Sequence, residues 1–158
     1  MRYVVSDAYR DKLEKEKAQR TVQLLFKAAR LLNERAIARV QERTDPRIRV
    51  AHTALFPHVD LEGTRLTEIA RRLGTTKQAA GQLVDELEEL GVLERVADPA
   101  DARAKLVRFS KKGRRGLLEG LEVLRGIEEE MRAVVGDAKM RAMHEALAAI
   151  IAAVETEK

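Results

Sequence analysis

One predicted helix opens with side chains that can form hydrogen bonds to a ligand. They are Thr75, Thr76, Lys77, Gln78 and Gln82. A glutamine can form two hydrogen bonds with adenine, and a lysine can bond to the edge of guanine. The run 79–81 is Ala-Ala-Gly, and its small side chains would let the backbone approach a ligand closely. The alternative is that these residues are ordinary exposed positions of a helix.

Cationic side chains on both sides of this helix could contact phosphate groups. They are Arg65, Arg95, Lys105, Arg108, Lys111 and Lys112, together with the hydroxyl group of Thr67. Such contacts position a protein on a nucleic acid but read no base sequence. Thr67 could also offer the N-terminus of a helix to a phosphate. For each cation, ordinary solvation is the alternative.

The histidines His52, His58 and His144 do not have the pattern of a metal site. A zinc site needs three or four ligands, the chain has no cysteine, and His144 lies far from the other two in the sequence. His52 and Phe56 could instead line a ligand cavity or pack in the core. The sequence also has no nucleophile–base pairing and no phosphate-cradling glycine loop. We therefore expect no enzymatic activity, no metal and no cofactor.

Composition favours a single, mostly helical domain with a helical extension. The chain has 158 residues, of which 45% are hydrophobic, 35% charged and only 3% aromatic. Its net charge of +4 is uneven: residues 1–49 carry 13 Lys and Arg against 7 Asp and Glu, whereas residues 117–158 carry 5 against 9. We expect one face to approach a polyanion. The sequence shows neither a membrane span nor a signal peptide, which is compatible with the cytoplasm.

Long helices are predicted at both ends of the chain. Apolar residues at steps of three and four predict one helix from about Ala8 to Thr44. Asp45 and Pro46 are then expected to begin a short helix, 47–56, which ends at Pro57. Residues 50–59 are uncharged and are expected to be buried. Near the C-terminus, Ser110 and Asp137 are expected to cap two further helices, whose apolar faces one chain cannot cover. This pattern indicates an intertwined homodimer.

The central segment has the pattern of a helix-turn-helix followed by a hairpin. Thr67 is expected to cap the first helix, which Gly74 closes, and Thr75 or Thr76 to cap the second, which ends at Gly91. Residues 92–96 and 105–109 are predicted strands, and the polar segment 97–104 is predicted to be the loop between them. A hairpin directly after the second helix is a wing.

These residues resemble the MarR family, the multiple-antibiotic-resistance regulators. The resemblance covers Leu66 to Gly113, and its most specific part is Asp98-Pro99-Ala100-Asp101-Ala102-Arg103, of the form Asp-Pro-x-Asp-x-Arg. The phrase Leu87–Arg95 also fits, whereas the outer helices fit by pattern only. Many relatives have Ser or Thr and then Arg where this chain has Gly81 and Gln82, so base preference cannot be copied from them.

The resemblance implies a winged helix-turn-helix homodimer that binds a pseudo-palindromic operator in double-stranded DNA. It implies that the helix from Thr75 or Thr76 enters the major groove and that Arg103 of the wing enters the minor groove. Asp101 is expected to pair with an arginine and so to fix the conformation of the wing. Lys105 is expected to be a further DNA-binding residue of the wing. Arg65, Thr67, Arg95 and Lys111 are the expected phosphate contacts. A small, often aromatic, ligand releases many such repressors, and the family cavity would be lined here by His52 and Phe56.

The expected fold is therefore mainly α with a small β-hairpin wing. We expect an N-terminal dimerisation helix in 1–46, a winged helix-turn-helix lobe in 47–110 and C-terminal dimerisation helices in 111–158. A sequence-specific transcriptional repressor is the leading hypothesis. A ligand-independent architectural DNA binder and a protein-interaction module are the alternatives, although the basic wing tip at Arg103 argues against the second.

Overall fold

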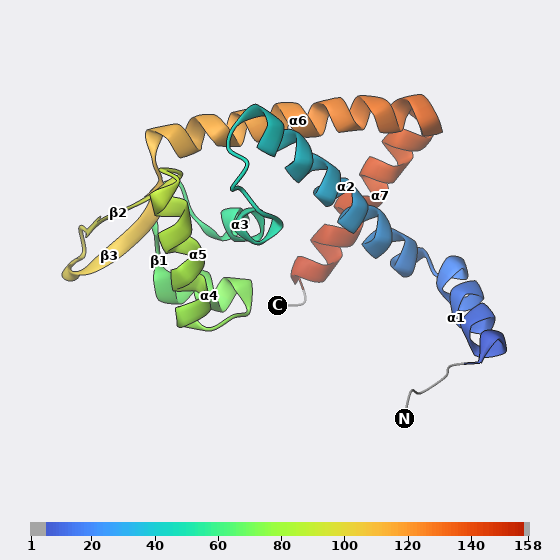
Figure 1. Ribbon diagram of the computed structural model, residues 1–158, viewed down its shortest axis with the longest axis horizontal. Helices are drawn as coiled ribbons and strands as arrows, with labels where there is room; N and C mark the ends of the chain where they lie inside the picture. The colour runs from blue at the N-terminus through green and yellow to red at the C-terminus, as the bar shows by residue number, and fades with distance from the viewer. Residues whose placement is uncertain (1–5, 157–158) are drawn as a thin grey trace. The chain divides into compact units, whose positions relative to one another are not determined.

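The computed structural model describes residues 6–156, apart from the side chain of Ala102. It is mainly helical, with one three-stranded antiparallel sheet, which confirms the predicted fold class (Figure 1). The chain divides into two compact units between Val50 and Ala51. The elements are α1 (Asp7–Gln19), α2 (Thr21–Arg43), α3 (Val50–Leu55), β1 (Thr64–Arg65), α4 (Leu66–Leu73), α5 (Lys77–Glu89), β2 (Leu93–Asp98), β3 (Asp101–Phe109), α6 (Lys111–Val135) and α7 (Asp137–Thr156).

The first unit contains two helices where the sequence predicted one. Arg20 has extended backbone angles (φ −98°, ψ 112°) and separates α1 from α2. Thr21 and Val22 follow it, and β-branched residues lower helix propensity at this point. Because no residue of α1 is buried in the described chain, packing does not hold the helix straight across the weak point.

The segment after α2 also differs from its prediction. Asp45 does not cap a helix: its Oδ1 accepts a hydrogen bond from the Arg47 backbone N–H at 3.0 Å, which closes a turn. Consequently α3 begins only at Val50, and Pro57 lies inside a turn of 3₁₀ helix, Phe56–His58. The uncharged stretch 50–59 is only partly buried. Its buried side chains are those of His52, Leu55 and Val59.

In the second unit, two helices are joined by a short turn, as the sequence predicted. Gly74 ends α4 with φ 67°, and the left-handed conformation suits a glycine. Thr76, rather than Thr75, caps α5: its hydroxyl oxygen accepts a hydrogen bond from the Ala79 backbone N–H at 3.1 Å. Thr67 is not a cap, because it lies inside the helix. α4 begins at Leu66, and Arg65 occupies the N-cap position.

The core of the second unit lies beneath these two helices and the sheet. Its fully buried side chains include Leu55 of α3, Ile69 of α4, Val84 and Leu87 of α5 and Val107 of β3. The strand order is β1-β3-β2, and every pair is antiparallel. This packing fixes α5 and the hairpin on one lobe.

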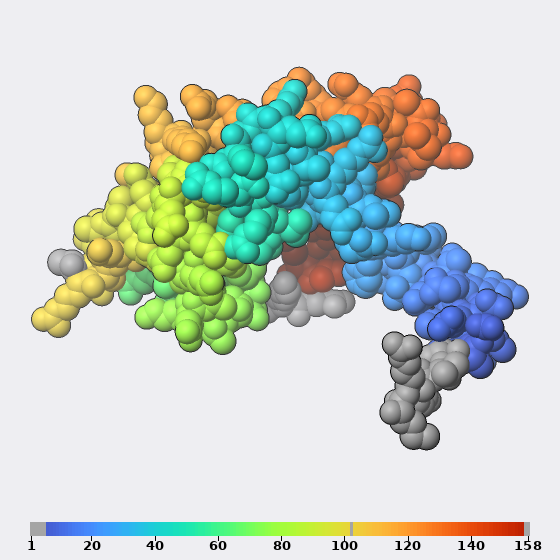
Figure 2. Space-filling view, viewed as in Figure 1, coloured from blue at the N-terminus to red at the C-terminus, as the bar shows by residue number. Residues whose placement is uncertain are grey.

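The hairpin is more regular than the sequence predicted. Asp98 pairs with Asp101, so Pro99 and Ala100 alone form the turn, where a loop of residues 97–104 was expected. A register irregularity lies between Ala97 and Asp98, directly before the turn. β1, which the sequence did not predict, adds a third strand through the pair Arg65–Leu106. In Figure 2 the yellow hairpin projects beyond the green helices of the lobe.

Ser110 caps α6 as predicted, whereas Asp137 does not cap α7, because it is the first residue of that helix. The Ser110 hydroxyl group accepts a hydrogen bond from the Gly113 backbone N–H at 2.9 Å. Gly136, with φ 83°, ends α6, and Asp137 lies in the first turn of α7. None of the residues 137–156 that make up α7 is buried. Among residues 6–156, no helix combines the length and apolar character that a bilayer span requires.

Candidate nucleic-acid interface

The N-terminal end of α5 presents the predicted hydrogen-bonding side chains to solvent. Those of Thr75, Thr76, Lys77, Gln78 and Gln82 are all exposed. The structure thus gathers on one helix end every side chain that was expected to contact bases.

The small residues in this segment do not all face outward, contrary to the interpretation that they clear a path for a ligand. Ala80 is fully buried, and a Cβ atom on Gly81 would lie 3.6 Å from Cδ2 of Leu66 on α4. Ala80 therefore belongs to the core, and a side chain at position 81 would make an ordinary van der Waals contact with α4. Only Ala79 is exposed beside the two glutamines.

Arg95 joins the wing to the C-terminal half of α5. Its Nη1 lies 2.8 Å from Oδ1 of Asp85 and also pairs with Glu88. The side chain of Arg95 is three-quarters buried, so its charge is largely used within the lobe. A phosphate contact by Arg95 stays a prediction. In the structure its guanidinium group pairs with two carboxylates of α5 and offsets part of their negative charge.

Arg65 and two aspartates fix the base of the wing. Arg65 Nη2 lies 2.7 Å from Oδ2 of Asp98 and 3.6 Å from Oδ2 of Asp101. The backbone N–H of Ala100 donates to Asp98 Oδ1 at 2.9 Å, and that of Arg103 donates to Asp101 Oδ1 at 3.1 Å. The structure thus places Asp101 near an arginine, but the closer partner, Asp98, was not foreseen.

These contacts favour the charged forms of the groups involved. Hydrogen bonds from the backbone of Ala100 and from Arg65 lower the pKa of Asp98 below its ordinary value of 3.8. The hydrogen bond with Asp98 in turn raises the pKa of Arg65. Arg103 itself is exposed beyond this base, as is Lys105. The wing therefore presents two cations on β3, after a turn that carboxylates hold in place.

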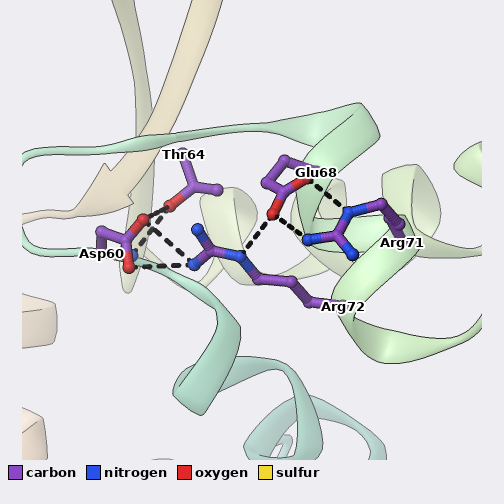
Figure 3. Close-up of polar contacts among 5 residues, drawn as sticks. All are labelled: Asp60, Thr64, Glu68, Arg71 and Arg72. Carbon is purple, nitrogen blue, oxygen red and sulfur yellow. Dashed lines mark hydrogen bonds and ion pairs between the residues drawn. The ribbon is translucent and has the colours of Figure 1, made fainter. Parts of the chain in front are cut away.

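A second polar network, which the sequence did not predict, joins the last turn of α4 to Glu68 and to the loop before β1 (Figure 3). Arg72 Nη1 donates to both carboxylate oxygens of Asp60 at 3.0 Å, and its Nε donates to Glu68 Oε1 at 2.8 Å. Arg71 also donates twice to Glu68, and the Thr64 hydroxyl group donates to Asp60 at 3.0 Å. The hydrogen bonds from Arg71 and Arg72 lower the pKa of Glu68 from 4.5 to about 2. The network ties the helix to the loop before β1.

The remaining residues that were predicted to contact phosphate lie near the starts of α4 and α6. Thr67 is exposed in the first turn of α4, next to Arg65. Lys111 is exposed at the start of α6, where Lys112 Nζ donates to the Leu90 carbonyl at 2.7 Å. Leu90 lies at the opposite end of α5 from Thr76, about 20 Å along the helix axis. Arg108 donates to Glu94 at 2.8 Å.

His52 and Phe56 both make contacts inside the second unit. The buried His52 has its Nε2 atom 2.7 Å from Oε2 of Glu86 on α5. The ring of Phe56 packs edge-on against Phe109, with centroids 5.6 Å apart. A partly open hollow of about 180 Å³ lies elsewhere, between α6 and α7, and is lined by Glu128, Arg132, Met140, Arg141, His144 and Glu145. Across residues 6–156, no three His, Asp or Glu side chains are grouped as metal ligands.

The comparisons with known proteins agree with this geometry. A family model described as "MarR family" matches residues 58–104, which include α4, α5 and most of the wing. This segment, less than a third of the chain, is therefore similar to the MarR family. No curated protein matches the chain at a significant level.

Solved structures resemble the chain over most of its length. RV1404 from Mycobacterium tuberculosis has a TM-score of 0.71 and 22% identity, over 87% of this chain and 96% of its own. The transcriptional repressor CouR bound to a 23-mer DNA duplex has a TM-score of 0.62 and 24% identity, over 89% and 95%. CouR from Rhodococcus jostii RHA1 bound to p-coumaroyl-CoA has the same score and identity, over 85% and 93%. These likenesses show that the chain has the winged-helix fold.

Proposed function

We propose that this chain is a homodimeric MarR-family transcriptional repressor that binds a pseudo-palindromic DNA operator. The observation that carries the proposal is the pairing, on one lobe, of an exposed N-terminal end of α5 with a wing whose base is fixed by Arg65, Asp98 and Asp101. A wing ordered in advance loses less conformational entropy on binding. The DNA-bound structure of CouR, which has the same fold, supports this use of the lobe.

The dimer is supported by apolar side chains that the single chain leaves exposed. They include Leu24 and Phe26 of α2, Leu121 of α6, and Ile151 and Val154 of α7. Exposed apolar side chains gathered on long helices mark an interaction surface. We propose that a second copy covers them and sets the spacing of the two α5 helices to one turn of DNA, about 34 Å.

A small-molecule effector is the second part of the proposal. CouR has been solved with p-coumaroyl-CoA, so one protein of this fold binds an aromatic acyl thioester. We propose that His52 and Phe56 border an effector cavity in this chain. The contact between His52 and Glu86 would transmit a displacement of α3 to α5. Release from DNA then requires that the effector bind the two conformations with different affinity.

Fluorescence anisotropy tests the DNA-binding proposal. The full chain is titrated into labelled duplexes from the DNA upstream of its own gene, at several salt concentrations, with an unrelated duplex as competitor. Tight binding that resists the competitor supports a specific regulator. Binding lost equally to any duplex would favour an architectural protein, and no binding at low salt would overturn DNA recognition altogether.

Sedimentation equilibrium tests the dimer separately. Ile151→Glu places a charge on the exposed apolar face of α7 and should convert the dimer to monomer. Lys139→Glu, also on α7 but at an exposed polar position, is the matched control and should remain dimeric. A wild-type chain that sediments as a monomer at micromolar concentration would contradict the proposed assembly.

A further inference from the structure

The exposed face of α5 changes its chemical character along the helix. Gln78, Ala79 and Gln82 are exposed within the first two turns. Positions three and four apart lie on the same side of a helix, with Cβ atoms about 5–6 Å apart. These three side chains therefore form one contiguous surface, which we call the reading surface, at the end of α5 that Thr76 caps.

The reading surface has the donors and acceptors that suit A·T base pairs. A glutamine amide can donate to and accept from the major-groove edge of adenine, and an alanine methyl group can contact the thymine methyl group. Guanine is usually recognised by an arginine or a lysine, and the reading surface contains neither. The single cation of α5 is Lys77, at the first position of the helix.

The next turns of α5 cannot extend the reading surface. Asp85 and Glu89 continue the exposed side of the helix, and both are acidic. Arg95 pairs with Asp85 and Glu88, which offsets part of the acidic charge of these turns but adds no base-reading group. A carboxylate placed against a phosphate backbone is repelled, so this part of α5 must stay outside the groove.

We propose that the reading surface selects A·T base pairs at the positions under Gln78, Ala79 and Gln82. This inference rests on the proposed function, because it takes operator binding as given. Gln78 and Gln82 are then the specificity-determining residues of the helix. The wing and the start of α4 supply the contacts with phosphate, which α5, with one lysine and four acidic residues, cannot supply.

Selection from a randomised duplex library tests the inference with the full chain. The enriched half-site should contain A·T pairs at the positions whose preference changes in Gln78→Ala or Gln82→Ala. Replacing one of these pairs by G·C should weaken wild-type binding by about fivefold to 100-fold. The matching alanine variant should bind both duplexes equally within about twofold. Both variants should fold, because alanine is the best helix former.

Two comparisons make the result specific. Glu89→Gln places a glutamine further along the same exposed side of α5 and should create no new base preference. Arg103→Ala should weaken binding to all duplexes alike, because it removes a wing contact and no base reader of α5. Enrichment of G·C pairs under the glutamines would overturn the inference while operator binding stands. So would discrimination at the base pair under Gln82 that survives in Gln82→Ala. A library that shows no enrichment at all would overturn the proposed function as well.

Discussion

The guanidinium group of Arg65 and the carboxylate of Asp98 meet at 2.7 Å and join β1 to the turn of the wing. Asp98 is buried, whereas the side chain of Arg65 is half-exposed. The same carboxylate accepts the backbone N–H of Ala100, so one aspartate organises both the base and the tip of the hairpin. The order of the wing therefore depends on a residue that itself need not touch DNA.

Asp98→Asn should weaken DNA binding although it changes no proposed DNA contact. The amide can still accept from Ala100, but it loses the charge-assisted bond with Arg65, so the wing should become more mobile. Anisotropy titration measures the affinity, and hydrogen exchange at Ala100 and Arg103 reports the mobility. Asp101→Asn is the matched control, because its 3.6 Å contact is longer and its effect should be smaller. Equal affinity of Asp98→Asn and wild type would contradict a role for this contact in binding.

The network around Glu68 should make part of the stability depend on pH. Hydrogen bonds from Arg71 and Arg72 lower the pKa of Glu68 from 4.5 to about 2. The folded state therefore favours the ionised carboxylate, and this contribution is complete above pH 4.5 and is lost as the pH falls towards 2. Wild type should be more stable than Glu68→Gln at neutral pH, and the difference should shrink over that window.

Chemical denaturation at a series of pH values measures this difference in the free energy of unfolding. Because the network lies at the surface, high salt should reduce the difference at neutral pH. Glu62→Gln, an exposed position in the loop before β1, is the control and should show no such trend. A difference that stays constant between about pH 5 and about pH 2.5 would rule out Glu68 as the source.

Local signals in the sequence predicted the helix-turn-helix. The contacts that the sequence did not predict join residues far apart in the chain. Thr76, Gly74 and Ser110 act on residues within a few positions of themselves, so their roles could be predicted from spacing. Arg65 and Asp98 are 33 residues apart, and His52 and Glu86 are 34 apart. No periodicity identifies such partners in a single sequence.

The strands of the sheet also depend on partners that are distant in the sequence. β1 has two residues, too few to form a recognisable alternation, and it exists because β3 offers it a partner. The segment 97–104 has turn-forming residues, yet six of its eight residues lie in β2 and β3. Tertiary pairing, supported by Arg65 at the base of the wing, overrides the local preference there.

Gly113 and Gly116 should respond in opposite ways to the same substitution. A Cβ atom on Gly113 would lie 2.0 Å from the Val92 carbonyl oxygen, whereas one on Gly116 would have nothing within 4 Å. Gly113→Ala should therefore destabilise the protein by about 1–3 kcal/mol through overpacking. Gly116→Ala should stabilise it by about 0.5–1 kcal/mol, because alanine has the higher helix propensity.

Thermal unfolding of both variants at one protein concentration checks the pair, since the stability of a dimer depends on concentration. The comparison also explains one of the glycines at the start of α6: Gly113 permits the close approach of α6 to the end of the wing, where Val92 also accepts from the Ser110 backbone N–H at 3.0 Å. A stable Gly113→Ala variant would show that the backbone can shift at no cost, and would remove this explanation.

Arg103→Ala should weaken DNA binding at every sequence and leave the proposed dimer intact. Arg103 is exposed on the wing, and a hydrogen bond from its own backbone N–H to Asp101 fixes its position. A cation inserted in the minor groove releases counterions, so its loss should reduce the slope of log affinity against log salt by about 1. Titrations over a range of salt concentrations measure the slope. Lys15→Ala removes one charge from the exposed helix α1 and should leave the slope unchanged. If both variants lower affinity by the same factor, the effect belongs to net charge and the wing has no specific contact with DNA.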